Sequence, residues 1–238
     1  MYKKEKNCDE NNPADARRGD NWDHVALDAE HKLVLQVVNG KRTEKNTKKL
    51  VRLTAKRLQN KPPRLMTSDE YKPYKKAILE VFGTKEEVER SGRRGRPRKP
   101  RYRPPKDLVY ATVHKTQVKG RVKKIDYRTV FGTEEQVLSA LQESRCSRKV
   151  NTSFIERQNG TDRNRCSRKT RKSYCFSKSW SSHRAATCLS MYSYNFCWVV
   201  RTLRRPDGLP GECSPAMAAG LTDHVWTIRQ WLTFPERQ

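Results

Sequence analysis

Positive charge far exceeds negative charge in this sequence, and the excess limits how much of the chain can pack into a hydrophobic core. The 238 residues include 52 Lys and Arg but only 26 Asp and Glu, which gives a net charge of +26. Hydrophobic residues make up 34% of the chain, a lower share than globular domains usually have. We therefore expect a core of modest size, with much of the chain in contact with water or with a polyanion.

The positive charge is concentrated in the middle of the chain. Residues 1–83 carry a net charge of +7, residues 84–178 carry +17 and residues 179–238 carry +2. Phosphate groups are the natural partner of such a segment, so the charge favours a nucleic-acid-binding protein over a merely solvated basic surface. RNA is an alternative ligand, but the sequence has no motif of the RNP or KH type.

Short β-rich runs alternate with helical patterns along the chain. Residues 24–28 and 33–38 predict one β-hairpin, residues 108–114 and 121–131 predict another, and residues 64–68 predict a single strand that ends before Asp69. The spacing of apolar residues predicts helices in four stretches, which are residues 43–58, 70–81, 133–141 and 185–196. This order of elements is typical of an α/β fold with a mixed sheet and flanking helices.

Changes in composition divide the chain into four segments. We expect residues 1–83 to form one α/β segment and residues 84–149 to form a basic insertion with a hairpin. Residues 150–200 would supply further helices, and residues 201–238 a tail. No apolar run is long enough to cross a membrane. The seven cysteines include no CxxC pair, and their odd number without a secretion signal predicts reduced thiols in the cytoplasm.

Two carboxylates lie in contexts that suit phosphate chemistry. Asp69 follows a predicted strand, and ligands gather at the carboxyl ends of strands in open α/β sheets. Glu156 is followed by Arg157, and Arg163 lies two helical turns further on, so it would share a face with Glu156. Carboxylates bind Mg²⁺, and arginines bind phosphate. The alternative is structural, with Asp69 as a helix cap and Glu156 in a surface ion pair.

Several motifs together resemble the transposases of the insertion sequence one family, which are prokaryotic DDE transposases. The matching stretches are Trp22–Asp28, Met66–Tyr74, Ile155–Asn159 with Arg163, and Phe176–Ser179. The resemblance covers most of residues 7–200 and implies an RNase-H-like fold. Residues 1–83 would then be the N-terminal part of the catalytic domain, and residues 150–200 its C-terminal catalytic helices. The same resemblance implies that the chain cuts and joins DNA strands, with Asp69 as the second catalytic carboxylate and Glu156 as the third, holding two Mg²⁺ ions.

The resemblance also implies partners and a location. The partner would be double-stranded DNA, both the element ends and the target, with a homo-oligomer as a further possibility and no membrane. The location would be the prokaryotic cytoplasm, on the nucleoid when bound.

One part of the family pattern has no match. The first catalytic Asp belongs to a first strand that would precede Lys3, so we expect an N-terminally truncated chain in which that strand is missing. Asp28, at the end of a predicted strand, is a spare carboxylate candidate. Catalytic activity of this chain is therefore doubtful, and a non-catalytic basic DNA-binding remnant remains the alternative function.

A second motif lies within the basic insertion. Arg94-Gly95-Arg96-Pro97 resembles the core of an AT-hook, in which an extended backbone directs arginines into a narrow minor groove. The alternative is a basic linker that contacts any phosphate. In either case this arm is predicted to bind DNA through five cationic side chains, those of Arg93, Arg94, Arg96, Arg98 and Lys99.

Overall fold

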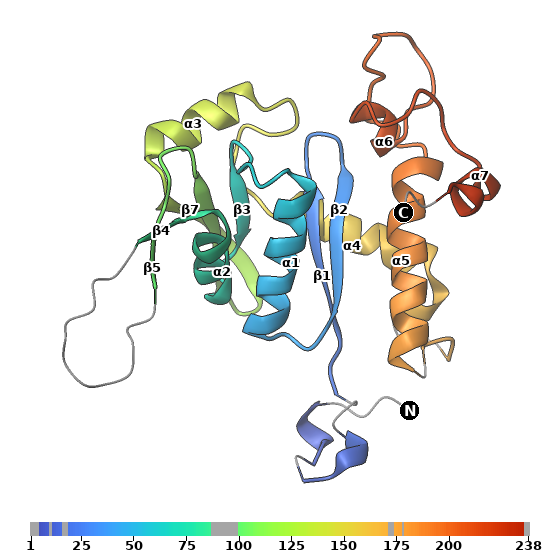
Figure 1. Ribbon diagram of the computed structural model, residues 1–238, viewed down its shortest axis with the longest axis horizontal. Coiled ribbons are helices and arrows are strands. Elements are labelled where there is room, and N and C mark those ends of the chain that lie inside the picture. The colour runs from blue at the N-terminus through green and yellow to red at the C-terminus, as the bar shows by residue number, and fades with distance from the viewer. Residues whose placement is uncertain are drawn as a thin grey trace. The chain divides into compact units, whose positions relative to one another are not determined.

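The computed structural model describes residues 5–9, 11–15, 19–86, 100–170, 174–177 and 179–235, which form two units (Figure 1). Unit 1 comprises residues 1–42 and 153–238, and unit 2 comprises residues 43–152. These boundaries differ from those of the four predicted segments, because residues 1–42 are grouped with residues 153–238, and residues 43–83 are grouped with residues 84–152.

A mixed three-stranded sheet organises unit 2. Its strands are β3 (Met66–Asp69), β6 (Tyr110–Val118) and β7 (Arg121–Phe131), in the order β3-β6-β7. β3 runs parallel to β6, and β7 runs antiparallel to it across a two-residue turn. The hairpin prediction for residues 121–131 is confirmed in full, while β6 begins two residues later than predicted and ends four residues later.

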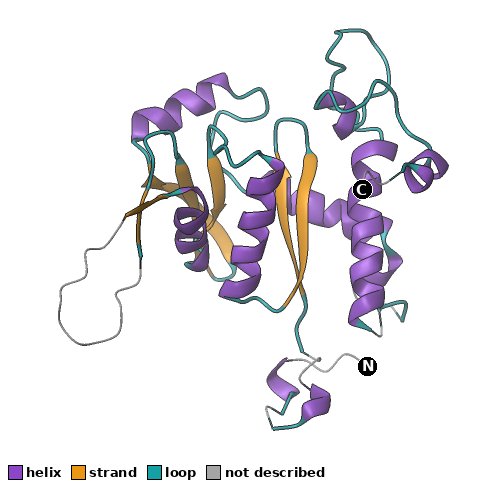
Figure 2. Ribbon diagram, viewed as in Figure 1, coloured by secondary structure: helices purple, strands orange, loops and turns teal. Residues whose placement is uncertain are grey.

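Helices cover both faces of this sheet. On one face α1 (Glu44–Arg57) and α2 (Pro73–Phe82) lie side by side, as Figure 2 shows, and bury Val51 and Ile78 against Tyr110 and Phe131. On the other face α3 (Glu134–Glu143) buries Val137 against Val109, Ala111 and Val113. Because successive strand residues point to opposite faces, β6 contributes to both layers of core. The predicted α/β class with a mixed sheet and flanking helices is thereby confirmed.

A small second sheet precedes β6. β4 (Thr84–Glu86) pairs antiparallel with β5 (Arg101–Arg103), and Glu86 forms an ion pair with Arg103. This sheet was not predicted from the sequence, since polar and basic residues without alternation give no strand pattern. Residues 87–99, which connect the two strands in sequence, lie outside the described residues.

Unit 1 contains the first hairpin and the C-terminal helices. β1 (Trp22–Asp28) pairs antiparallel with β2 (Leu33–Gly40), as predicted but with slightly longer strands. The helices are α4 (Ser153–Arg165), α5 (Trp180–Cys197), α6 (Pro215–Ala218) and α7 (Ile228–Thr233). Short 3₁₀ turns occupy Glu5–Asn7, Pro13–Asp15 and Ser167–Lys169.

Helix α5 packs on β2 through a polar residue as well as apolar ones. Met191 and Tyr194 bury against Val34 and Val37. Asn195 donates a hydrogen bond to the carbonyl of Val34 and accepts one from its N–H, each 2.9 Å long. The spacing of apolar residues over 185–196 predicted this helix but not its buried face, which is formed by Thr187, Met191, Ser193, Tyr194 and Asn195.

None of the helices in the described part of the chain is both long enough and apolar enough to cross a bilayer.

Candidate nucleic-acid interface

Asp69 ends β3, at the carboxyl edge of the unit 2 sheet, as the sequence predicted. Its side chain is exposed, and its Oδ1 atom accepts a hydrogen bond from the N–H of Tyr71 at 3.4 Å. One residue earlier, the hydroxyl groups of Ser68 and Tyr110 are 2.7 Å apart. Burial raises the pKa of Tyr110, the bond with Ser68 opposes that shift, and the negative charge of Asp69 reinforces it. Asp69 therefore faces solvent beside a partly buried pair of hydroxyl groups.

The neighbouring carboxylate is already engaged. Glu70 Oε2 lies 2.5 Å from Nδ1 of His114, and Glu70 Oε1 lies 3.5 Å from a guanidinium nitrogen of Arg128. The strand pairing explains the first contact, because β3 lies directly beside β6 and Asp69 is opposite Val113. Glu70 therefore holds the edge of the sheet together rather than offering a free ligand.

Glu156, Arg157 and Arg163 all lie on α4 in unit 1, and Glu156 occupies its first turn. The predicted helix start is confirmed, so the seven-residue spacing does place Glu156 and Arg163 on one side of the helix. Glu156 and Arg157 are exposed, and Arg163 is half-buried. Neither arginine forms an ion pair within the described ranges, so both cations are available to an outside anion.

Asp28 ends β1, as predicted, and its carboxylate is used by the turn that follows. Its Oδ1 atom accepts a hydrogen bond from the N–H of Glu30 at 2.9 Å, and its Oδ2 atom lies 2.6 Å from Nδ1 of His31. This is the usual way in which an Asp stabilises a tight turn. The structure thus gives Asp28 a role in the β1–β2 hairpin.

The candidate carboxylates are divided between the two units. Asp69 belongs to unit 2, whereas Glu156 and Asp28 belong to unit 1. The described parts of the chain contain no group of three or more His, Cys, Asp or Glu side chains placed to hold a metal ion. Among these residues, neither Asp69 nor Glu156 is therefore part of a three-ligand group. The five cations predicted for the hook-like arm, Arg93, Arg94, Arg96, Arg98 and Lys99, lie outside the described residues.

Unit 1 contains a buried ionic cluster that was not predicted. Lys169 Nζ lies 2.5 Å from Asp162 Oδ2 and 2.8 Å from Asp23 Oδ2, and its side chain is only 5% exposed. His183 Nε2 lies 3.0 Å from Asp23 Oδ1, and the Ser190 hydroxyl donates to Asp162 Oδ1 at 2.7 Å. No local sequence signal marks this cluster, because its members come from β1, α4, a 3₁₀ turn and α5.

The charge state of the cluster follows from these contacts. Burial raises the pKa of the Asp23 carboxyl, but the hydrogen bond from His183 and the nearby Lys169 ammonium outweigh that effect and hold the pKa well below its usual range. Asp23 is therefore ionised at neutral pH. Lys169 is thus held inside unit 1 and does not belong to the basic surface.

Arg165 is a second cation that is occupied within the unit. Its guanidinium lies 4.4 Å from the ring centre of Trp198 and 5.5 Å from that of Tyr194. It also donates a hydrogen bond to the carbonyl of Ser190 at 3.3 Å. Burial raises the pKa of Tyr194 to about 12, although Arg165 opposes that shift. Such cation–π contacts join α4 to α5.

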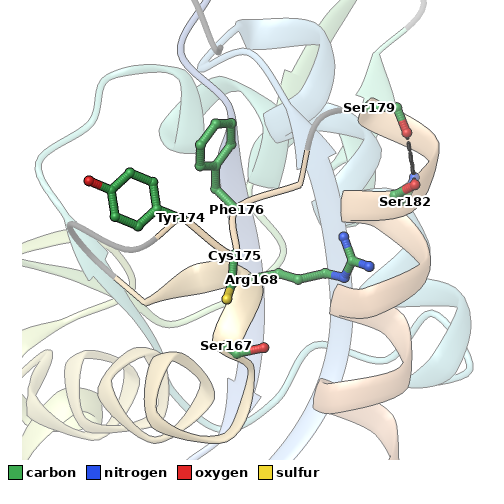
Figure 3. A pocket seen from close by; sticks show the side chains of 7 residues that line it. All are labelled: Ser167, Arg168, Tyr174, Cys175, Phe176, Ser179 and Ser182. Atoms are coloured by element: carbon green, nitrogen blue, oxygen red, sulfur yellow. Dashed lines mark hydrogen bonds between the residues drawn. The ribbon is translucent and has the colours of Figure 1, made fainter.

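A pocket of about 520 Å³ opens at the start of α5 (Figure 3). Figure 3 shows Arg168 extending toward the first turn of α5, where Ser179 accepts a hydrogen bond from the N–H of Ser182 at 3.2 Å. Arg168 has no ion-pair partner among the residues that the structure describes. The side chain of Tyr174 is 98% exposed. The lining consists of Ser167, Arg168, Tyr174, Cys175, Phe176, Ser179 and Ser182.

An arginine, several hydroxyl groups and an exposed aromatic ring make this pocket suited to a phosphate or a nucleotide. From its sequence the surrounding segment was expected to be basic, and its residues Phe176–Ser179 are one of the stretches that carry the family resemblance. The cap at Ser179 follows from the rule that Ser precedes a helix, and that signal was available in the sequence.

No family model, curated protein or solved structure matches this chain.

Proposed function

We propose that this protein binds duplex DNA and cuts and rejoins DNA strands as a DDE transposase does, within an RNase-H-like catalytic fold. The observation that carries the proposal is the net charge of +17 in residues 84–178, in a chain whose Asp69 ends a strand of a mixed α/β sheet. Clustered cations bind phosphates regardless of sequence, and carboxylates at strand ends are suited to metal-assisted chemistry.

The distribution of unpaired cations supports binding of a polyanion. Arg157 and Arg163 on α4 and Arg168 at the pocket form no ion pairs within the described segments. By contrast, the buried cation Lys169 is fully engaged between two carboxylates. These three arginines can therefore contact phosphate without first breaking an internal ion pair.

Asp69 and Glu156 are the proposed metal-binding carboxylates. Bound Mg²⁺ would neutralise the charge that develops on a phosphodiester under attack. Each residue is exposed and lies at the end of a regular element, Asp69 at the end of β3 and Glu156 in the first turn of α4. Arg157 and Arg163, from the same helix as Glu156, would hold the phosphates of the DNA strand.

A gel-shift titration with a 30-base-pair duplex tests the binding step. We expect duplex binding that weakens steeply with salt, with a log–log slope of several units, because each neutralised phosphate contributes about 0.9. Binding that does not change between 50 and 200 mM salt, or no binding at all, would contradict the proposal.

Metal-directed cleavage tests the carboxylates. Fe²⁺ replaces Mg²⁺ at oxygen-rich sites, and with ascorbate and peroxide it cuts the polypeptide close to where it is bound. We expect cuts near both residue 69 and residue 156, and loss of both sets of cuts in Asp69→Asn and in Glu156→Gln. The matched controls are Asp107→Asn and Glu212→Gln, which are exposed carboxylates outside the motifs that carry the resemblance. Independent loss of one set in each variant would refute a shared metal site.

A second candidate function is DNA binding without chemistry. The observation that favours it is that the described residues include no group of three metal-ligating side chains. The two functions differ in one assay. If the protein is a transposase, it should nick supercoiled DNA in the presence of Mg²⁺, and Glu156→Gln should abolish the nicking. If it only binds DNA, the wild type should leave the DNA intact, and Glu156→Gln should not change the gel shift.

A further inference from the structure

The hairpin formed by β6 and β7 extends past the sheet that anchors it. β3 pairs with β6 only from Tyr110 to Val113, whereas the pairing of β6 with β7 continues to Val118 and Arg121. Beyond that point no third strand accompanies the hairpin in the described part of unit 2. We call residues 115–125 the ribbon. Every ribbon residue after Lys115 is exposed, so the ribbon presents both of its faces to the outside.

The ribbon combines positive charge with exposed apolar side chains. It contains no acidic residue, and Lys124 pairs with Asp126 just beyond its end at 3.0 Å. Val118 and Val122 are each 48% exposed, and Ile125 is 57% exposed. The five cations of the ribbon are Lys115, Lys119, Arg121, Lys123 and Lys124. Exposed lysines on a strand usually prevent it from pairing with strands of other chains. Large exposed apolar side chains favour such association, so protection against it does not explain the composition of the ribbon.

A tight two-residue turn keeps the two strands of the ribbon paired up to its tip. Lys119 and Gly120 have φ angles of 49° and 75°, so both are in the left-handed region that a two-residue turn of type I′ requires. Residues paired across two strands share a face. Val118 therefore lies beside Arg121, and Gln117 lies beside Val122. Each face thus carries an apolar side chain next to a polar or cationic one.

We propose that the ribbon binds in the major groove of duplex DNA. The major groove is about 12 Å wide and admits a two-stranded ribbon, whereas the minor groove, about 6 Å wide, would have to be forced open. The cations would contact the phosphates on either side, and the valines and Ile125 would contact thymine methyl groups. Double-stranded RNA is excluded as the preferred ligand, because its major groove is too narrow to enter. This inference rests on the proposed binding of duplex DNA.

Two ribbon variants of the full chain separate the contributions of charge and of apolar contact. The charge variant replaces Lys119, Arg121, Lys123 and Lys124 by Gln, and the apolar variant replaces Val118, Val122 and Ile125 by Thr. Thr keeps the β-branched shape, so the strands should persist, and circular dichroism checks this. The matched control removes four exposed cations from α1, namely Lys45, Lys49, Arg52 and Lys56.

The expected results differ between the variants. The charge variant should weaken duplex binding at least tenfold and lower the log–log salt slope by about 3.6, because four contacts contribute about 0.9 each. The apolar variant should weaken binding about fivefold without changing the slope. The α1 control should change the affinity less than threefold. Methylation of guanine N7, which blocks the major groove, should weaken binding of the wild type but not of the charge variant.

Other outcomes would overturn the inference. If the charge variant loses no more affinity than the α1 control, or if N7 methylation affects the wild type and the charge variant equally, the ribbon does not enter the major groove. Equal affinity for a duplex RNA of the same sequence would also refute it. These results leave DNA binding by the rest of the chain intact, whereas a wild type that binds no duplex would refute the proposed function as well.

Discussion

Replacing Lys169 by Met tests how much the buried ionic cluster of Lys169, Asp162 and Asp23 stabilises unit 1. Lys169 is 5% exposed and contacts two carboxylates, of which Asp162 is 4% exposed and Asp23 is 20% exposed. Methionine has a similar volume but no charge, so the substitution leaves both carboxylates without their common cation. Breaking a buried ion pair by removing one partner costs about 3–5 kcal/mol.

The hydrogen bonds that the two carboxylates keep in Lys169→Met narrow the expected loss of stability. Among the described residues, Asp162 keeps one side-chain donor, the hydroxyl of Ser190, while Asp23 keeps two, His183 and Asn39. The cost therefore falls mainly on Asp162, and we expect a loss of about 3–4 kcal/mol. With a urea dependence of about 2 kcal/mol per molar, the unfolding midpoint should fall by about 1.5–2 M.

Tryptophan fluorescence is the assay, because all five tryptophans belong to unit 1. Urea unfolding followed by fluorescence therefore reports on unit 1 and leaves unit 2 silent. The control is Arg168→Met, which removes the adjacent but exposed cation and should shift the stability by less than about 0.5 kcal/mol. The double variant Lys169→Met/Asp162→Asn removes the uncompensated charge and should recover part of the loss. A midpoint for Lys169→Met equal to that of the wild type would refute the reasoning.

Three further changes have defined expectations. Lowering the pH below the ordinary Asp pKa of about 3.9 should destabilise unit 1. The pKa of Asp23 is depressed in the folded protein, so its ionised carboxylate stabilises the fold above that pH, and this stabilisation is lost as the pH falls further. Asp23→Asn should therefore flatten the pH dependence of the melting temperature measured by fluorescence. Thr133→Ala removes the capping box of α3 and should cost about 1 kcal/mol in urea unfolding followed by circular dichroism, with Ser matching the wild type. Gly132→Ala should cost at least about 1 kcal/mol in the same assay, because its φ is 85° and a Cβ atom would lie 2.9 Å from Gln136 Oε1.

The elements with strong local signals could be predicted from the sequence. The hairpins at β1–β2 and β6–β7 follow from β-rich runs around short polar turns, and α3 follows from the capping box of Thr133 and Gln136. The division into units could not be predicted, because it depends on which distant segments pack together. β1 and β2 join α5 through contacts about 160 residues apart, for which no local pattern exists.

The candidate site was predictable only in part. The placement of Asp69 at a strand end and of Glu156 in a helix start required only local reading, and both are as expected. The contacts of Asp28 with Glu30 and His31 in its own turn could be recognised only from the geometry of the hairpin. The burial of Lys169 could not be predicted for a similar reason. A lysine is expected to be exposed unless its ion-pair partners from other segments are known.

The contact between Asn195 and β2 has a consequence for synthesis of the chain. The amide of Asn195 satisfies the N–H and the carbonyl of Val34, yet 161 residues separate the two along the sequence. At the usual rate of about 5–20 residues per second, a ribosome needs about 8–30 s to make that stretch. During this interval the main chain of β2 at Val34 lacks its partner. Strand edges left in that state recruit strands from other chains, so the nascent protein passes through a period in which chaperone binding competes with aggregation.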